Sequence, residues 1–194
     1  MATTNGQRDE QREKIFEAVE SKFGFVPNLI RELAESPAVA QTYLNGADAL
    51  SSGAFTQKEQ QVIQATVAVY NACHYCTAAH GTIALGAGLD KDELAAILKG
   101  ETPSDERLAA IVDTTREVLE QRGWLDEDEQ AAIEARGLSR AELFEIIGFI
   151  GVKTLSNYVN HVAETEVDEQ FSEVTKMPEY QEAIKRKKPA GVAG

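Results

Sequence analysis

The sequence predicts an all-α fold. Apolar residues recur three and four positions apart along most of the chain, which is the period of a helix with one buried face. Residues that begin or end helices separate these stretches, and no stretch shows the alternation typical of a strand. The length of 194 residues suits one domain, or one domain with an added helical segment, and the hydrophobic fraction of 43% is enough for a sizeable core.

The helices expected before the cysteines follow from apolar spacing and capping signals. Ile15, Val19 and Phe23 mark the buried face of the first helix, and a proline suits the first turn of the next two. Thr56 and Glu59 match a capping box. These signals predict helices over residues 9–23, 27–33 and 37–50, and from 56 to about 71.

Beyond these helices, glycines end most of the expected elements. Gly86 and Gly88 close the cysteine-bearing helix, and Ser139 with Glu142 forms another capping box. Further helices are expected over residues 90–100, 103–123, 126–137 and 140–162. The last is apolar on most of its circumference, which predicts central burial or a subunit interface.

The expected division of the chain has three parts. Residues 1–36 form an N-terminal helical segment, and residues 37–177 form the main helical domain. Residues 178–194 are polar and carry a basic run at 185–188, which indicates a frayed tail or an arm onto a neighbouring chain.

The charge of the chain argues against two classes of partner. The formal net charge of −13 disfavours nucleic acid and anionic membranes, because both need a basic face. The first residues are polar throughout, so neither a secretory signal nor a membrane span is predicted. The expected location is the cytoplasm.

The two cysteines of the chain are the strongest functional signal. They lie three residues apart in Cys73-His74-Tyr75-Cys76, and His80 follows four residues after the second. If Cys73 opens a helix, positions 73, 76 and 80 share one face. A disulfide between the two thiols would close a short loop, so its formation costs little chain entropy. An imidazole can exchange protons with a sulfur.

Other interpretations of these residues are weaker. Two buried small side chains are a common fate of cysteine. Zinc would need Cys73, Cys76, His80 and either His74 or His161, but structural zinc usually draws its ligands from two separated pairs. A thioredoxin fold is disfavoured because its motif belongs beside a βαβ pattern. The prediction is a helical redox motif without metal or cofactor.

The positions of the two cysteines along the helix do not by themselves decide which sulfur is the nucleophile. A cysteine in the first turn of a helix feels its positive end, which lowers the thiol pKa. Cys73 is nearer that end, whereas Cys76 is one turn from His80. We expect a functional role for His80 rather than that of a satisfied core histidine. His74 is expected to face solvent, and Tyr75 to pack with its hydroxyl at the rim of the site.

The stretch Glu59-Gln60-Gln61 and the stretch from Asn71 to His80 resemble the core of the AhpD-like superfamily, which includes alkylhydroperoxidase D and carboxymuconolactone decarboxylase. The resemblance is specific over about residues 40–100. It extends more loosely through residues 155–161, which look like the later segment of a peroxidase-related branch. It implies an all-helical bundle, usually a homotrimer or homohexamer, with the cysteine pair near a subunit interface. It also implies thiol-dependent reduction of peroxides, recharged by a dithiol partner.

The resemblance also implies roles for single residues. Cys76 attacks the peroxide, Cys73 resolves the product, and His80 matches the histidine of the motif. The relay glutamate of the family falls on Gln61, which cannot take a proton at neutral pH. A histidine sometimes found just before the second cysteine is Tyr75. The relay as usually drawn is therefore broken.

Two other residues are candidate substitutes for the relay glutamate. Glu59 lies on a different helical face and is a capping carboxylate first. His161 shares a face with Asn157, one turn earlier, which would orient its ring. We therefore predict His161 as the alternative proton donor.

Three functions follow from the sequence. The first is a thiol oxidoreductase acting on hydroperoxides or another small molecule and recharged by an external dithiol. The second is a lactone decarboxylase or related acid-base enzyme that uses His80 or His161, although such chemistry needs no sulfur pair. The third is a non-catalytic oligomer whose thiols form a redox-sensitive latch.

Overall fold

The computed structural model describes residues 5–185, and every regular element in this part of the chain is helical. The all-α prediction is thereby confirmed. The elements are α1 (Asn5–Phe23), α2 (Asn28–Leu33), α3 (Pro37–Ser51), α4 (Gln57–Tyr70), α5 (His74–Gly86), α6 (Lys91–Lys99), α7 (Glu106–Gln121), α8 (Glu127–Ala135), α9 (Arg140–Ala163), the 3-10 helix η1 (Glu169–Phe171), α10 (Ser172–Thr175) and α11 (Pro178–Ala183). None of these helices is long and apolar enough to cross a membrane.

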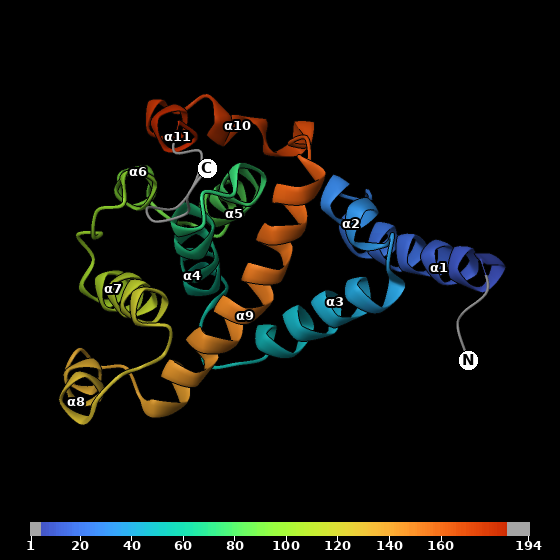
Figure 1. The fold of residues 1–194 in the computed structure, drawn as a ribbon. Coiled ribbons are helices and arrows are strands. Elements are labelled where there is room, and N and C mark those ends of the chain that lie inside the picture. Colours follow the sequence, from blue (N-terminus) through green and yellow to red (C-terminus); the bar gives the residue numbers. More distant parts are fainter. Residues whose placement is uncertain (1–4, 186–194) are drawn as a thin grey trace.

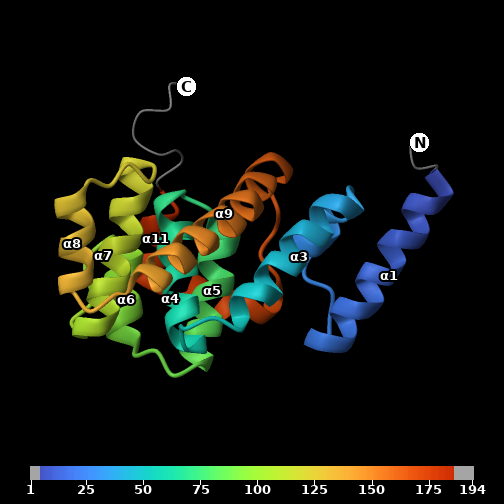
Figure 2. The same cartoon turned by 90° about the horizontal axis from the view of Figure 1, so that it is seen from below.

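Helix α9 is the central element of the molecule. It runs between α4 to α8 on one side and α1 to α3 on the other (Figure 1), and it packs against α2, α3, α4, α5 and α7. Seen from below, α1 and α3 lie at one end of the molecule, away from α6, α7 and α8 (Figure 2). The predicted central burial of this helix is thus observed along one of its faces.

Helices α3 and α9 approach each other closely because glycines lie at their contact. A Cβ added at Gly46 would come within 2.8 Å of Val152, and one added at Gly148 would come within 2.9 Å of Leu50. Neither space admits a larger side chain without movement of the neighbouring one. The close approach brings Tyr43 of α3 to the middle of α9.

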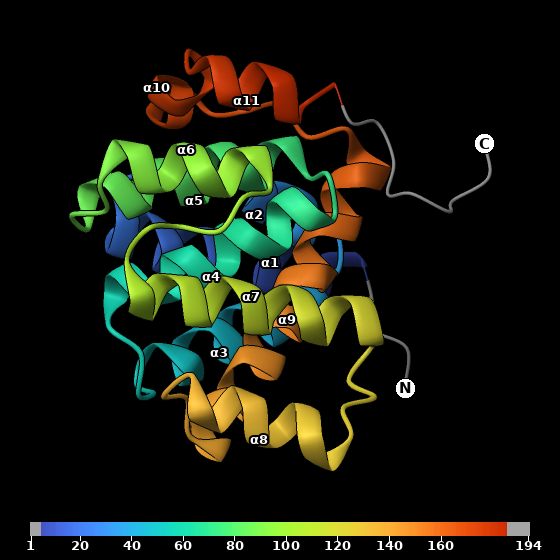
Figure 3. The same ribbon diagram turned by 90° about the vertical axis from the view of Figure 1, so that its left-hand side faces the viewer.

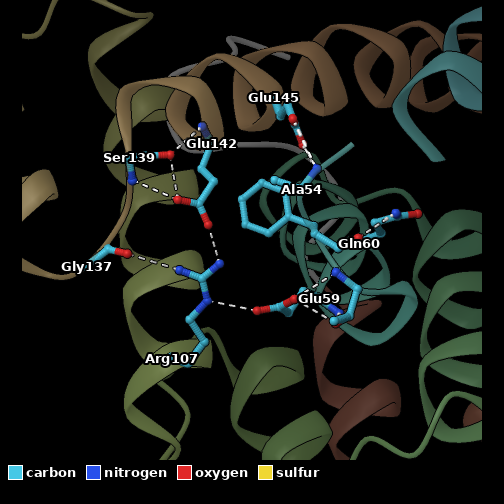
Figure 4. A network of polar contacts seen from close by, with 10 residues as sticks. Ala54, Glu59, Gln60, Arg107, Gly137, Ser139, Glu142 and Glu145 are labelled. Carbon is cyan, nitrogen blue, oxygen red and sulfur yellow. Dashed lines mark hydrogen bonds and ion pairs between the residues drawn. The ribbon is translucent and has the colours of Figure 1, made fainter. Parts of the chain in front are cut away.

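Both predicted capping boxes at the starts of α4 and α9 are present. Glu59 completes the first and Glu142 the second. Arg107 of α7 lies between them and pairs with both carboxylates (Figure 4); its Nε is 2.8 Å from Glu59 Oε1. Glu59 is therefore a capping and pairing residue, and it ties the start of α4 to α7 and α9.

Helix α7 begins at Glu106, three residues after the start that the sequence indicates. Its N-cap is Asp105, whose Oδ1 accepts a hydrogen bond from the Leu108 amide at 2.9 Å. Ser104 is engaged elsewhere, because its amide and hydroxyl both donate to the carboxylate of Glu93. Its two hydrogen bonds to Glu93 hold Ser104 outside the helix, so α7 starts after Asp105.

The C-terminal part contains elements that the sequence did not reveal. Residues Pro178–Ala183, expected to belong to a frayed tail or arm, form α11, and its Tyr180 and Ala183 are buried. Helix α11 packs on α6, and α10 packs on α5 (Figure 3). Lys185 is exposed, and residues 186–194 lie outside the described part of the chain.

The apolar interior divides into two clusters of buried residues. The larger lies between α4, α6, α7, α8 and α9 and includes Ile63, Leu94 and Ile146. The second lies between α1, α2, α3 and α5 and includes Ile15, Leu33 and both cysteines. Full burial of each large aliphatic side chain stabilises the fold by about 1.5–3 kcal/mol. The N-terminal segment thus covers the cysteine pair.

Candidate active site

The two cysteines are placed by a tight connection between α4 and α5. Ala72 adopts a left-handed backbone conformation with φ of 53°, and the Cys73 amide donates to the carbonyl of Ala68 at 2.8 Å. Cys73 is then the N-cap of α5, and Cys76 is its third residue. Both sulfurs therefore lie in the first turn, where the helix favours negative charge.

Helix α9 supplies the groups around the two sulfurs. Asn160 Nδ2 donates to Cys76 Sγ at 3.1 Å and lies 3.7 Å from Cys73 Sγ. Ser156 Oγ is 4.0 Å from Cys76 Sγ and donates its own hydrogen bond to the carbonyl of Lys153. Both thiols are free, and each residue is only 1% exposed.

The two thiols differ in charge at neutral pH. Burial raises the pKa of Cys76, but the hydrogen bond from Cys73, the charge of Lys153 and the amides of Asn157 and Asn160 outweigh it and lower that pKa to about 6. The hydrogen bond with Cys76, together with burial, raises the pKa of Cys73. Cys76 is therefore the thiolate, and Cys73 remains a neutral thiol that donates to it.

His80 lies between an amide and an ammonium group. Its Nδ1 is 2.8 Å from Gln61 Oε1, and its Nε2 contacts Lys153 Nζ. An amide oxygen only accepts and an ammonium only donates, so the proton of the neutral ring lies on Nδ1. Burial and the adjacent Lys153 charge hold the pKa of His80 well below its usual value. His80 is thus neutral at pH 7.

Lys153 is the main site residue that the sequence analysis missed. It is completely buried, and its Nζ also lies 3.4 Å from the hydroxyl of Tyr43 and over the face of that ring. A signal was available, because a lysine in the middle of an apolar helix needs an explanation. Four buried polar residues of α9 share one helical face at spacings of three and four: Lys153, Ser156, Asn157 and Asn160.

The Tyr75 hydroxyl is bound by groups other than the cysteines. It donates to Asp168 Oδ2 at 2.6 Å and accepts from the Leu29 amide at 3.4 Å. Burial and the Asp168 carboxylate raise the pKa of Tyr75. Asp168 also accepts from the Asn28 amide. Tyr75 therefore ties the cysteine-bearing turn to α2 and to the segment after α9.

The structure does not bring His161 into the group around His80. His161 is exposed, and its ring packs on Tyr158 with centroids 6.1 Å apart. Asn157, expected to orient it, instead accepts a hydrogen bond from Asn71 Nδ2 at 2.9 Å. Partial burial and the nearby charge of His74 lower the pKa of His161. His74 is exposed, as its position between the cysteines indicated.

Asn160 Oδ1 is a buried polar atom beside the sulfurs that has no hydrogen-bond partner among the described residues. Buried amide atoms rarely stay unpaired, so this oxygen indicates a place for water or for a donor group of a ligand. In the same part of the chain, no three His, Cys, Asp or Glu side chains are grouped to hold a metal ion.

Comparison with known proteins gives a family match over part of the chain. The model of the Carboxymuconolactone decarboxylase family matches residues 37–113, a range that contains Gln61, Cys73, Cys76 and His80. Among curated proteins, none matches the sequence significantly.

Several solved structures resemble the chain over most of its length. An uncharacterized peroxidase-related protein from Ralstonia eutropha JMP134, described as an alkylhydroperoxidase AhpD core, is 26% identical with a TM-score of 0.72, over 84% of this chain and 87% of that chain. A peroxidase-related protein from Silicibacter sp. TM1040 is 19% identical, with the same TM-score and coverage. A variant of the debrominase Bmp8 in complex with 2,3,4-tribromopyrrole is 17% identical with a TM-score of 0.69, over 89% of this chain and 93% of that chain. The chain is thus similar to the Carboxymuconolactone decarboxylase family over residues 37–113 and, in fold, to an alkylhydroperoxidase AhpD core over most of its length.

Proposed function

We propose that the protein is a thiol-dependent oxidoreductase that reduces hydroperoxides through Cys73 and Cys76. The observation that carries the proposal is the asymmetry of the pair. One buried sulfur is held as a thiolate, and its neighbour is a neutral thiol that contacts the same Asn160 amide. A nucleophile next to a resolving thiol is the arrangement that two-electron peroxide reduction needs.

The reaction balances with these two residues. The Cys76 thiolate attacks the outer oxygen of the hydroperoxide, the O–O bond breaks, and the alkoxide leaves as alcohol after taking a proton. Cys76 becomes a sulfenic acid, and the Cys73 thiol displaces its hydroxyl as water to form a disulfide. An external dithiol then reduces the disulfide by exchange and is itself oxidised.

The surroundings of the pair favour a small organic substrate. Apolar residues of α1, α2 and α3 pack around the cysteines, and the side chains nearest the sulfurs carry no carboxylate. A carboxylate in the substrate would be attracted by Lys153, but it would have to pass the apolar residues of α1, α2 and α3 to reach the sulfurs. We therefore expect faster turnover of organic hydroperoxides than of hydrogen peroxide.

A halogenated aromatic compound is the second substrate class to assay. Bmp8 is a debrominase of the same fold. Here the Cys76 thiolate would take bromine from carbon and the ring would take a proton. Cys73 would then displace bromide to give the same disulfide, so that two thiols reduce one carbon–bromine bond. The two thiols would play the same roles with either substrate class, so assays with both classes are needed to distinguish them.

The test is steady-state consumption of several hydroperoxides and of bromopyrroles with several dithiol donors. We expect turnover by the wild type and none by Cys76→Ser. Cys73→Ser should consume at most one equivalent, because its sulfenic acid has no internal partner. Mass spectrometry of the oxidised wild type should show loss of two hydrogens across a peptide that spans both cysteines.

The other outcomes separate the alternative functions. Turnover of a lactone without loss of thiols would favour the acid-base enzyme. Reversible loss of two thiols with no turnover of any substrate would favour the redox latch. We further propose a cytoplasmic location and a homotrimeric or homohexameric assembly, which the acidic composition and the exposed apolar residues of α9 support.

A further inference from the structure

We propose that Lys153 is the positioning residue of the thiol site: its buried ammonium holds Cys76 as a thiolate and presents His80 with its proton on Nδ1. The inference deepens the proposed function, because it concerns the attacking sulfur of that reaction. It begins from the burial of Lys153 and from the identity of its partners.

The first observation is a buried cation without a carboxylate. Lys153 is completely buried in α9, and its hydrogen-bond partners are His80 Nε2 and the Tyr43 hydroxyl, both neutral. Burying an unpaired ammonium destabilises a fold, and a negative charge nearby offsets at least part of that cost. The Cys76 thiolate supplies that charge. Ser156, whose Oγ lies 4.0 Å from Cys76 Sγ, donates to the Lys153 carbonyl, and His80, which contacts Lys153 Nζ, follows Cys76 by one turn of α5. The attraction between Lys153 and Cys76 is one of the forces that lower the Cys76 pKa.

The second observation concerns the other charged and titratable groups near this pair. Tyr43 comes from α3, and His80 and Cys73 come from α5, whereas α4 presents the uncharged Gln61. The neighbours on α9 are Ser156, Asn157 and Asn160, all uncharged.

Acidic residues near the site are already engaged by other partners. Glu59 pairs with Arg107, and Asp168 is bound to Tyr75 and the Asn28 amide. The ammonium and the thiolate are therefore each other's counter-charge.

The third observation is the direction of the hydrogen bonds through His80. Lys153 donates to Nε2, and Nδ1 donates to Gln61 Oε1, so the ring is held from both sides in one tautomer. With an uncharged residue at position 61, the ring is not stabilised as imidazolium. The positive charge of the site then resides on Lys153 rather than on the histidine.

The test measures thiolate formation directly, independent of any substrate. The rate of Cys76 alkylation by iodoacetamide is followed from pH 4 to 10, with the modified residue identified by mass spectrometry. In the wild type the profile should have a midpoint at about 6. Lys153→Met should move the midpoint up by about one unit or more, which lowers the thiolate fraction at pH 6 about fivefold. Lys153→Arg should keep the midpoint near that of the wild type.

Two further variants separate charge from hydrogen bonding and from folding. Lys153→Gln can still donate to His80 Nε2 but is neutral, so its midpoint should follow that of Lys153→Met. Lys176→Met removes an exposed lysine, paired only with Glu173 three residues away, and should leave the profile unchanged. Thermal melting should show Lys153→Met at least as stable as the wild type, because replacing a buried charge by an apolar chain is often neutral or stabilising.

A double variant tests whether a positive charge on His80 can replace the charge of Lys153. Lys153→Met combined with Gln61→Glu places a carboxylate against Nδ1, so His80 can become imidazolium and restore a positive charge beside Cys76. The double variant should recover part of the midpoint shift. An unchanged midpoint in both folded Lys153→Met and Lys153→Gln would overturn the inference. The same shift in Lys153→Arg would also overturn it, because the charge would then have no part.

These results are distinguishable from failure of the proposed function. If the midpoint shifts as expected but no hydroperoxide or halide is consumed, the Lys153 inference stands and the oxidoreductase proposal falls. If Cys76-dependent turnover is found but the alkylation midpoint is the same in the wild type and the Lys153 variants, the proposed function stands and this inference falls.

Discussion

Two chemically identical thiols become unequal through their positions in one helical turn. Cys73 is the N-cap residue and Cys76 the third residue of α5, and only Cys76 has both Asn160 at 3.1 Å and the attraction of Lys153. The shared proton therefore stays on Cys73. The pairing makes each thiol's charge depend on the other, so a change at one is expected to be measurable at its neighbour.

The first residue-scale prediction concerns Cys73. Cys73→Ala removes the hydrogen bond that lowers the Cys76 pKa, so the midpoint of Cys76 alkylation should rise above about 6. At pH 6 the alkylation rate should fall, whereas at pH 10 both proteins should react alike. Cys73→Ser retains a donor and should shift the midpoint less. A Cys73→Ala midpoint equal to that of the wild type would show that the two thiols are not coupled.

The second residue-scale prediction compares the histidines. A positioned acid-base group typically contributes a factor of about 10²–10⁴. The sequence predicts a loss of roughly a hundredfold in peroxide turnover for His161→Ala, with little change in alkylation. His80 lies between Gln61 and Lys153, one helical turn from Cys76. We expect His80→Ala to lower turnover by at least the factor predicted for His161→Ala. Unchanged turnover in His161→Ala beside a large loss in His80→Ala would assign the relay to His80 alone.

At the scale of helices, α9 carries two different surfaces. One side presents the polar groups Lys153, Ser156, Asn157 and Asn160 to the cysteines. Near its start, Glu142 meets Arg107, and Glu145 accepts from the Ala54 amide (Figure 4). The N-terminal end of the helix is thus held by an ion pair and by hydrogen bonds of Glu145. Further along, the helix is held by its contacts with the cysteines and His80.

The anchoring of this end predicts a pH-dependent stability. Arg107→Ala leaves Glu59 and Glu142 without their cation, which should lower the free energy of unfolding by about 1–3 kcal/mol. Although burial opposes it, hydrogen bonds from Thr56 and Arg107 lower the pKa of Glu59, and those from Arg107 and Ser139 lower that of Glu142. Their contribution is therefore present above the unfolded pKa of about 4.3 and is lost as the pH falls through the lower folded value.

Urea unfolding at pH 7 and at pH 3.5 measures this effect. The difference between the wild type and Arg107→Ala should be large at pH 7 and should shrink at the lower pH. Arg12→Ala, which breaks a more exposed pair with Glu35, serves as the control and should change stability by less than about 1 kcal/mol. An equal effect of the two variants would place the Arg107 contacts among ordinary surface pairs.

The cover over the thiols gives a second prediction at this scale. Asp168 holds the Tyr75 hydroxyl and the start of α2 together. Tyr75→Phe removes one of these hydrogen bonds while keeping the ring that packs on Phe171. We expect faster alkylation of Cys76 at a pH above its midpoint, because the cover opens more often. Thr82→Val, which removes a single hydrogen bond to the Phe171 carbonyl, is the control; an equal acceleration would contradict a specific role for Tyr75.

For the whole molecule, the exposed side of α9 is more apolar than solvent contact requires. Exposed large apolar side chains recur along one face of the helix at helical spacing: Phe144, Ile147, Tyr158 and Val162. Exposed apolar side chains gathered in a stripe on one helical face mark an interaction surface. It faces away from the polar groups that surround the cysteines, so burial of the stripe leaves the thiol site intact.

We predict that this stripe is buried between copies of the chain. Light scattering at micromolar concentration should give the mass of a trimer or hexamer. Ile147→Glu would place a charge in the contact and should shift the mass toward the monomer. Trp124→Glu removes an exposed aromatic residue outside α9 and should not change it. A wild-type protein that stays monomeric would rule out the contact.

The sequence by itself determined the helices and the presence of the thiol motif. Apolar spacing and capping residues are local, so α1 to α9 were expected within a few residues of their observed bounds. Helix α11 was not expected, because it packs on α6, a distant part of the chain. The three-residue shift in the start of α7 likewise follows from the contact of Ser104 with the distant Glu93. Cys73, Cys76 and His80 were singled out because their spacing is itself local.

Only the tertiary structure decided which groups surround that motif. Lys153 is 73 residues from His80 in sequence, and Asn160 is 84 residues from Cys76. No periodicity predicts such contacts, since they depend on how α9 packs against α5. The same packing leaves the His161 ring against Tyr158 and brings the Tyr75 hydroxyl to Asp168. Charge and hydrogen bonding act over a few ångströms, so the thiolate was assigned to Cys76 only once these partners were in place.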